Sequence, residues 1–265
     1  MLRIRSLLGF TRHSYYLMSA FLLICFLIVY IWWPLVEEYL SYADSRLPWY
    51  ANVDWLLLGV FAFMSLTIMS RADLKVDGLI VFVGLCGGLV IESWGTQTNL
   101  WHYYTAERPP LWIIPAWPIA SLSIDRITRS LHRLSARLDN VIFNAAYWLT
   151  FLCFFAGMLV FVAPTFDKSY TQAALVICAT IILTPIDKRR ALLVFVAGSA
   201  LGYFLERWGT TRECWIYYTH ETPPVFAVFA HGMAAVAFWR TGLLVTGIWE
   251  KLVVKIKLPG KVVLP

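Results

Sequence analysis

The sequence predicts an all-α integral membrane protein with about eight transmembrane helices, arranged as a tandem 4+4 parallel internal repeat. Three observations support this fold class. Hydrophobic residues make up 60% of the 265 residues and charged residues only 14%. Several charge-free runs reach the length that a helix needs to cross a bilayer. A long aromatic motif also occurs twice, at a constant spacing.

The repeated motif begins at Glu92 and returns at Glu206, 114 residues later. Eleven positions are identical between the copies without a gap, and each copy ends in a Pro-Pro pair. The residues identical in the two copies are, in order, Glu, Trp, Gly, Thr, Trp, Tyr, Tyr, Thr, Glu, Pro and Pro. This many matches at fixed spacing indicate an internal duplication. Residues 1–137 and 138–265 are the expected repeats.

Eight segments are expected as helices: 15–35, 55–70, 78–92, 109–125, 141–163, 172–186, 191–206, and 223 to beyond 239. Proline pairs open the fourth and eighth, because proline is favoured where a helix starts. Gly95 and Gly209 are expected in the turns that end the third and seventh helices. An even number of spans in each repeat directs both copies the same way through the membrane.

The orientation follows from the basic residues. With the N-terminus inside, 17 of the 22 Lys and Arg residues fall in cytoplasmic segments and five on the other side. The positive-inside rule then places both termini in the cytoplasm and both motif loops in the periplasm or outside the cell. The expected location is the cell membrane of a bacterium or archaeon. The first helix follows basic residues without a small-residue cleavage site, which favours an uncleaved anchor.

Composition and motifs exclude several function classes. The formal charge of +6 matches basic cytoplasmic loops, so no nucleic-acid partner is expected. The five cysteines form no CxxC pair. His102, His220 and His231 with the nearby glutamates lack the spacing of common metal motifs, and no metal or other cofactor is expected. Phosphate-loop, dinucleotide and serine-hydrolase motifs are missing from the sequence.

Glu92, Glu206 and His231 are the candidate catalytic residues. Each glutamate is expected about 22–24 Å along its helix, in the outer third of the hydrocarbon layer. Ionisable groups at that depth usually face a protein interior and mark functional sites. Glutamates that only hold the motif loops in place, as a structural brace, would show the same repeated pattern. His231 is the only histidine expected inside a span, and its counterpart in the first copy is Trp117.

Aromatic residues of both copies are the candidate substrate-binding residues: Trp94, Trp101, Tyr103, Tyr104, Trp208, Trp215, Tyr217 and Tyr218. An ordinary interfacial belt would also place Trp and Tyr here. Lining a pocket, their ring faces could stabilise a cation formed when a carboxylic acid protonates an alkene.

Part of the first copy resembles a known family. The run Glu92-x-x-Gly95-x-x-Thr98, then Tyr103-Tyr104-Thr105, then Pro110 to Trp117 with Pro115, is similar to membrane carotenoid-biosynthesis proteins of the bisanhydrobacterioruberin hydratase type. The resemblance implies a multispan enzyme that adds water to the end of a long isoprenoid.

Three functions therefore stay open. The first is an enzyme that modifies a membrane lipid or isoprenoid by carboxylate acid catalysis at the outer face of the membrane. The second is a transporter or flippase, since repeats and proline-broken helices also suit transport. The third is a non-catalytic subunit whose aromatic loops contact a membrane-protein partner at the periplasmic face.

Overall fold

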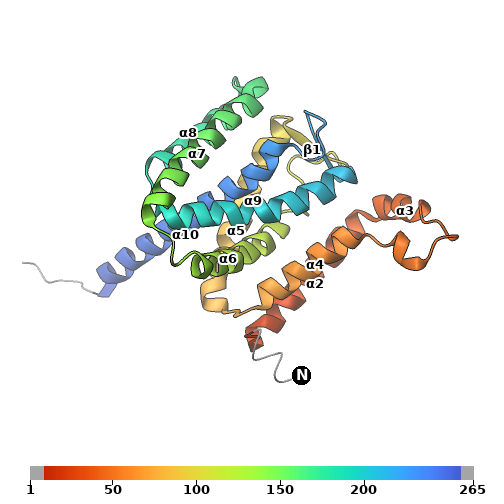
Figure 1. Cartoon of the computed structure of the whole chain (residues 1–265), viewed down its shortest axis with the longest axis horizontal. Helices are drawn as coiled ribbons and strands as arrows, with labels where there is room; N and C mark the ends of the chain where they lie inside the picture. Colours follow the sequence, from red (N-terminus) through yellow and green to blue (C-terminus); the bar gives the residue numbers. More distant parts are fainter. Residues whose placement is uncertain (1–8, 258–265) are drawn as a thin grey trace, which may run out of the picture.

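The computed structural model describes residues 9–257 and is all-helical in this range apart from two short strands (Figure 1). The helices are α2 (Arg12–Ile31), α3 (Trp33–Ser41), α4 (Trp55–Met69), α5 (Leu74–Gln97), α6 (Ala116–Leu134), α7 (Asn140–Val162), α8 (Ser169–Leu183), α9 (Lys188–Thr211) and α10 (Val225–Lys257). The strands are β1 (Trp101–Tyr103) and β2 (Trp215–Tyr217). The predicted all-α class is confirmed. Arg3, Arg5 and Lys261 lie outside the described residues, whereas the other three lysines expected in the basic tail belong to α10.

Five helices are long and apolar enough to cross a membrane, which indicates a membrane protein. They are α2, α5, α7 with the turn after it, α9 and α10. The apolar helices α4 and α8 have 15 residues each, about 22 Å of helix, less than the hydrocarbon layer of about 30 Å. Helix α6 carries Asp125, Arg126, Arg129 and Arg133 and does not qualify as a span by composition.

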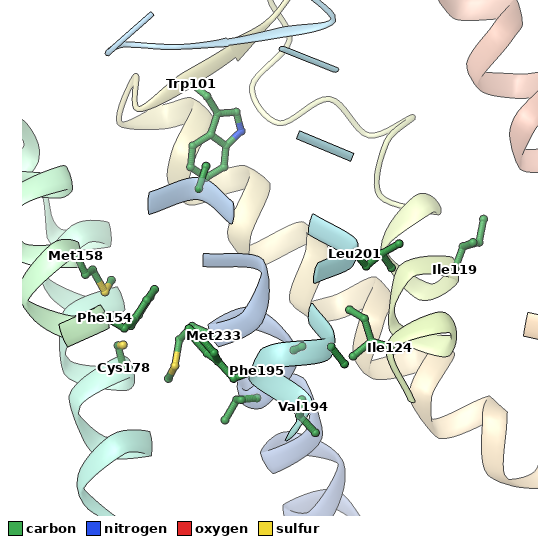
Figure 2. Close-up of a cluster of buried hydrophobic side chains, with 14 of the residues drawn as sticks. Trp101, Ile119, Ile124, Phe154, Met158, Cys178, Val194, Phe195, Leu201 and Met233 are labelled. Atoms are coloured by element: carbon green, nitrogen blue, oxygen red, sulfur yellow. The ribbon is translucent and has the colours of Figure 1, made fainter. Parts of the chain in front are cut away.

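Helices α5, α6, α9 and α10 occupy the middle of the molecule, with α2 and α4 on one side and α7 and α8 on the other (Figure 1). The central four come in equal number from the two predicted repeats. Helix α9 is the most enclosed of the possible spans. Figure 2 shows its Val194, Phe195 and Leu201 in the core between side chains of α6, α7 and α10.

The first predicted helix is divided into α2 and α3 at Trp32. Pro34 lies in the first turn of α3, where its missing N–H costs nothing. Pro34 has no N–H to donate to the Tyr30 carbonyl, so the helical hydrogen-bond pattern is interrupted here and the segment divides into two helices instead of continuing to Leu35 as one. Trp32 is only 6% exposed and packs into the core.

The fourth predicted helix starts and ends later than expected. Pro109 and Pro110 lie in a loop that contains a cis Arg108–Pro109 bond, and α6 begins only at Ala116. It then continues to Leu134 through the segment expected as a basic connection. Charge pairing permits this, because Asp125 holds Arg129 one turn further on, 2.8 Å away. Helix α10 does begin directly after Pro224.

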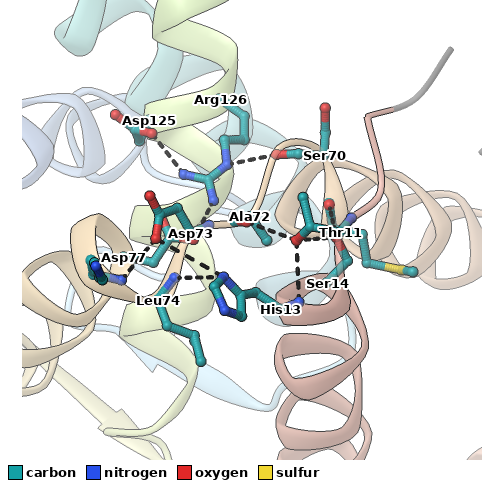
Figure 3. Close-up of polar contacts among 12 residues, drawn as sticks. Thr11, His13, Ser14, Ser70, Ala72, Asp73, Leu74, Asp77, Asp125 and Arg126 are labelled. Carbon is teal, nitrogen blue, oxygen red and sulfur yellow. Dashed lines mark hydrogen bonds and ion pairs between the residues drawn. The ribbon is translucent and has the colours of Figure 1, made fainter. Parts of the chain in front are cut away.

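A buried polar network joins α2, α5 and α6 (Figure 3). Arg126 donates to Asp77 at 2.7 Å, to Asp125 at 2.8 Å and to the Ser70 carbonyl at 3.1 Å. Ser14 of α2 donates to the Met69 carbonyl at 2.6 Å. Buried charges need such partners, so this network fixes how the first helices meet.

Candidate functional site

Both motif glutamates are buried near the C-terminal ends of central helices. Glu92 lies in α5 and is 3% exposed, and Glu206 lies in α9 and is 2% exposed. Each helix continues five residues beyond its glutamate, to Gln97 and Thr211. The expectation that the helices end at the glutamates was therefore wrong by more than one turn.

Three side chains donate hydrogen bonds to the Glu92 carboxylate. Trp101 Nε1 donates to Oε2 at 3.1 Å. Tyr103 Oη and Trp117 Nε1 both donate to Oε1, at 2.9 and 3.1 Å. Among the described residues, no cation is paired with Glu92. Donor bonds alone therefore compensate this carboxyl group for its loss of water.

The Glu206 carboxylate has the same arrangement with one change. Trp215 Nε1 donates to Oε2 at 2.9 Å, and Tyr217 Oη donates to Oε1 at 2.8 Å. The third partner is His231, whose Nε2 lies 2.8 Å from Oε1. Every partner stands 114 residues after its counterpart at Glu92. The two sites differ in one chemical property, because imidazole titrates and indole does not.

The turn after each helix brings the aromatic residues back onto the glutamate. Asn99 and Glu213 take positive φ values of 60° and 55° just past the helix ends. Leu100 N then donates to the Gly95 carbonyl at 2.9 Å, and Cys214 N to the Gly209 carbonyl at 3.0 Å. These are Schellman-type ends with a left-handed residue after the cap. The chain reverses, and the strand that follows runs beside the last helical turn.

Gly95 and Gly209 are inside the helices, not in the turns as predicted. A Cβ atom at Gly95 would lie 1.9 Å from the Trp101 ring, and one at Gly209 would lie 2.0 Å from the Trp215 ring. Glycine is needed at these positions because the indole rings occupy the space of a side chain. This contact lets each Trp reach the glutamate three residues before the glycine.

Strands β1 and β2 pair with each other, one from each copy of the motif. The pairing is antiparallel and joins Trp101 to Tyr217 and Tyr103 to Trp215. His102 and Ile216, themselves 114 residues apart, face each other at the centre. Side chains alternate along a strand, so the inward residues reach the glutamates while His102 is exposed. The two carboxylate sites are thus connected through this short ribbon.

Burial raises the pKa of Tyr103 and of Tyr217 well above its usual value, and the neighbouring carboxylates raise it further. Both hydroxyls therefore stay protonated at neutral pH and act as hydrogen-bond donors.

The other four predicted aromatic residues have polar ends that bond away from the glutamates. Trp94 Nε1 donates to Thr171 of α8 at 3.1 Å and Trp208 Nε1 to Asp54, just before α4, at 2.8 Å, so each bond reaches the other copy. Tyr104 and Tyr218 donate to the carbonyls of Ile31 and Phe161. Tyr104 and Tyr218 thus tie the ends of the ribbon to α2 and α7, whereas Trp94 and Trp208 link α5 to α8 and α9 to the start of α4. Trp94 also contacts the Trp101 ring edge to face.

Trp117 is a site residue that the sequence reasoning did not include. Its position 114 residues before His231 was the available signal. As for metals, no three His, Cys, Asp or Glu side chains gather closely enough to hold an ion anywhere between residues 9 and 257.

The fold and site define a helical membrane protein with two matching buried carboxylate sites. Comparisons with protein-family models, with curated proteins and with solved structures find no match for the chain. The resemblance to carotenoid hydratases therefore stays a prediction.

Proposed function

We propose that this protein is an eight-span membrane enzyme that performs acid–base chemistry on an isoprenoid or other membrane lipid at Glu206. The observation that carries the proposal is the 2.8 Å contact between Glu206 Oε1 and His231 Nε2. The first copy has Trp117 at this position, so only the second copy pairs its carboxylate with a titratable group. Such pairs in a protein interior are candidates for proton transfer.

The proposed reaction is the addition of water to an alkene. The Glu206–His231 pair gives one proton to a terminal double bond, which leaves a carbocation. Water attacks the cation, forms the C–O bond, and returns a proton to the pair, so the site is restored. Trp and Tyr rings around the glutamates suit a cation because their faces are electron-rich.

The proposed architecture is two parallel four-helix repeats related by an axis along the membrane normal. Support comes from the ribbon, in which His102 and Ile216 are at once sequence equivalents and paired neighbours. An antiparallel pair centred on equivalent residues has local two-fold symmetry. The bonds that flank the ribbon match as well: Tyr104 N donates to the Cys214 carbonyl and Tyr218 N to the Leu100 carbonyl.

The proposed orientation has both termini in the cytoplasm and the ribbon at the outer face. Its support is the distribution of Lys and Arg along the sequence. In this arrangement α4, α6 and α8 complete the eight spans, with the charges of α6 at the cytoplasmic end of the bundle. Water would reach the glutamates from the outside.

Two other functions predict different results. A purely structural role for the glutamates would need the same bonds, because the Trp and Tyr donors of β1 and β2 also hold the ribbon against α5 and α9. A transporter or flippase is favoured by a cavity at the opposite end of the same four central helices, with Asp125, Arg129 and Arg190 among its lining residues. The experiment below separates both from the enzyme.

The decisive variant is His231→Trp, which rebuilds in the second copy what the first copy already has. Lipids and pigments are profiled in a strain without the gene and in strains that carry the wild type, His231→Trp or Glu206→Gln. The enzyme predicts accumulation of an unhydrated precursor in the deletion strain and in both variants, at normal protein levels. Wild-type profiles in both variants would instead support a purely structural role for Glu206 and His231. A changed location of an otherwise unaltered lipid would indicate transport.

A further inference from the structure

A second candidate site lies at the other end of the central helices. A partly open cavity of about 270 Å³ lies between α5, α6, α9 and α10. It starts near the N-terminal ends of α5 and α9, whereas Glu92 and Glu206 lie near their C-terminal ends. Most of its lining is apolar, with Val83 and Val194 among the buried residues. Apolar cavities with a few polar groups are typical of ligand sites.

Two polar atoms in the lining have no partner. Thr128 Oγ1 and Trp239 Nε1 are both buried and make no hydrogen bond in the described part of the chain. Thr128 is 4% exposed. Buried polar groups are nearly always satisfied, so two unpartnered atoms on lining residues favour a ligand toward which the Thr128 and Trp239 side chains would turn. An indole N–H can only donate and a hydroxyl can donate, so an acceptor would satisfy both.

Among the charged side chains at the cavity, one arginine has no carboxylate partner. Asp77 and Asp125 are paired with Arg126, and Asp125 also with Arg129, which balances two aspartates against two arginines. Arg190 lies at the same rim with its guanidinium 5.7 Å from the Trp239 ring centre. Within residues 9–257 no carboxylate is paired with the Arg190 side chain. The unbalanced charge favours an anionic ligand.

We propose that this cavity binds a membrane amphiphile with an anionic phosphomonoester headgroup, held by Arg190, Thr128 and Trp239. Phosphate suits the fork of an arginine, and its further oxygens can accept from the hydroxyl and the indole. The alkyl part would leave the cavity along Val76 and Leu243, which line it and are 51% and 40% exposed. A lipid tail satisfies these apolar surfaces, and a soluble anion does not.

Phosphatidic acid is the probe, and binding to the purified full-length protein in detergent is measured by native mass spectrometry. We expect it to bind at least about tenfold more tightly than phosphatidylcholine, a factor that corresponds to about 1.4 kcal/mol. Arg190→Gln and Thr128→Val should weaken binding, the first by about tenfold. Inorganic phosphate at millimolar concentration should not compete.

Two glycines of α10 offer a variant that blocks the cavity and a matched control. A side chain at Gly242 or at Gly247 meets nothing within 4 Å, but only Gly242 lines the cavity. Gly242→Leu should fill the cavity and abolish phosphatidic acid binding, whereas Gly247→Leu should bind like the wild type. Arg133→Gln, an exposed arginine of α6 outside the cavity, controls for general charge.

Undiminished binding in Gly242→Leu and Arg190→Gln would overturn the site. Equal binding of phosphatidylcholine would overturn the assignment of the headgroup. Competition by inorganic phosphate would overturn the conclusion that the ligand is an amphiphile and not a soluble anion. None of these measurements depends on catalysis at Glu206. The cavity can therefore fail while the proposed enzyme stands, and the reverse also holds.

Discussion

Trp117 and His231 stack face to face, with ring centroids 5.8 Å apart and 20° between their planes. They are sequence equivalents, and each is hydrogen-bonded to the glutamate of its own copy. The stack therefore joins the two carboxylate sites at the point where they differ. Matching glycines make room for it, since a Cβ atom at Gly88 would lie 2.5 Å from the Trp117 ring and one at Gly202 would lie 2.8 Å from the His231 ring.

The first prediction concerns an exchange of these two rings. Because the surroundings match, the double variant Trp117→His/His231→Trp should fold with a melting temperature close to that of the wild type. It moves the titratable group to Glu92, so activity should survive in part if the two sites are equivalent. The single variant His231→Trp should have none. Thermal unfolding and lipid profiles check this, and a double variant that fails to accumulate would refute the equivalence.

The second prediction is that Gly95→Ala is strongly destabilising. The new methyl group would overlap the Trp101 ring, and overpacking of this kind costs about 1–3 kcal/mol or more. Gly59→Ala in α4 is the control, because a Cβ there meets nothing within 4 Å. It should be neutral or stabilise by about 0.5–1 kcal/mol through better helix propensity. Thermal unfolding in detergent compares them, and equal melting temperatures would contradict the packing argument.

The third prediction concerns the buried ion pair of Asp77 and Arg126. Asp77→Leu alone leaves Arg126 without its main partner in the interior and should cost about 3–5 kcal/mol. The double variant Asp77→Leu/Arg126→Met removes both charges and should recover much of that loss. Denaturant or thermal unfolding measures the difference. A double variant less stable than both single variants would show that the pair itself stabilises the fold.

The fourth prediction compares two kinds of tyrosine. Tyr217→Phe removes a bond to the Glu206 carboxylate, and bonds to charged groups contribute about 1.5–3 kcal/mol. Tyr218→Phe removes a bond to the Phe161 carbonyl, with an expected cost of about 0.5–1.5 kcal/mol. Tyr217→Phe should therefore be the less stable variant. The opposite order in thermal unfolding would argue that Glu206 is not ionised.

The fifth prediction tests the orientation. Cysteines introduced at His102 in β1 and at Arg137 after α6 should lie on opposite sides of the membrane, and both positions are exposed. A membrane-impermeant maleimide added to intact cells should label the cysteine at 102 and leave that at 137 unlabelled until the cells are opened. The reverse pattern would invert the proposed topology.

Much of the site could be predicted from the sequence because duplication marks it. Glu92 and Glu206 are charged residues that follow apolar segments and occur in both copies of the motif. These properties can be seen in the sequence around each glutamate. Trp101 and Tyr103 share the same repeated run. Which aromatic ring bonds to a glutamate could not be predicted. Trp101 reaches Glu92 because the chain reverses direction at Asn99 and because Gly95 has no side chain in the space that the indole ring occupies. Neither feature is encoded in hydrophobic periodicity.

The sequence by itself determined the helical class, the apolar segments and the two equivalent sets of residues, because composition and spacing act within one stretch of chain. Only the tertiary structure decided how the sets meet. Strand pairing between the copies, Trp208 on Asp54 across 154 residues, and the Trp117–His231 stack are all contacts between distant segments. Such contacts depend on how helices pack and turn in three dimensions, where small residues such as Gly95 and Gly202 set the distances of approach.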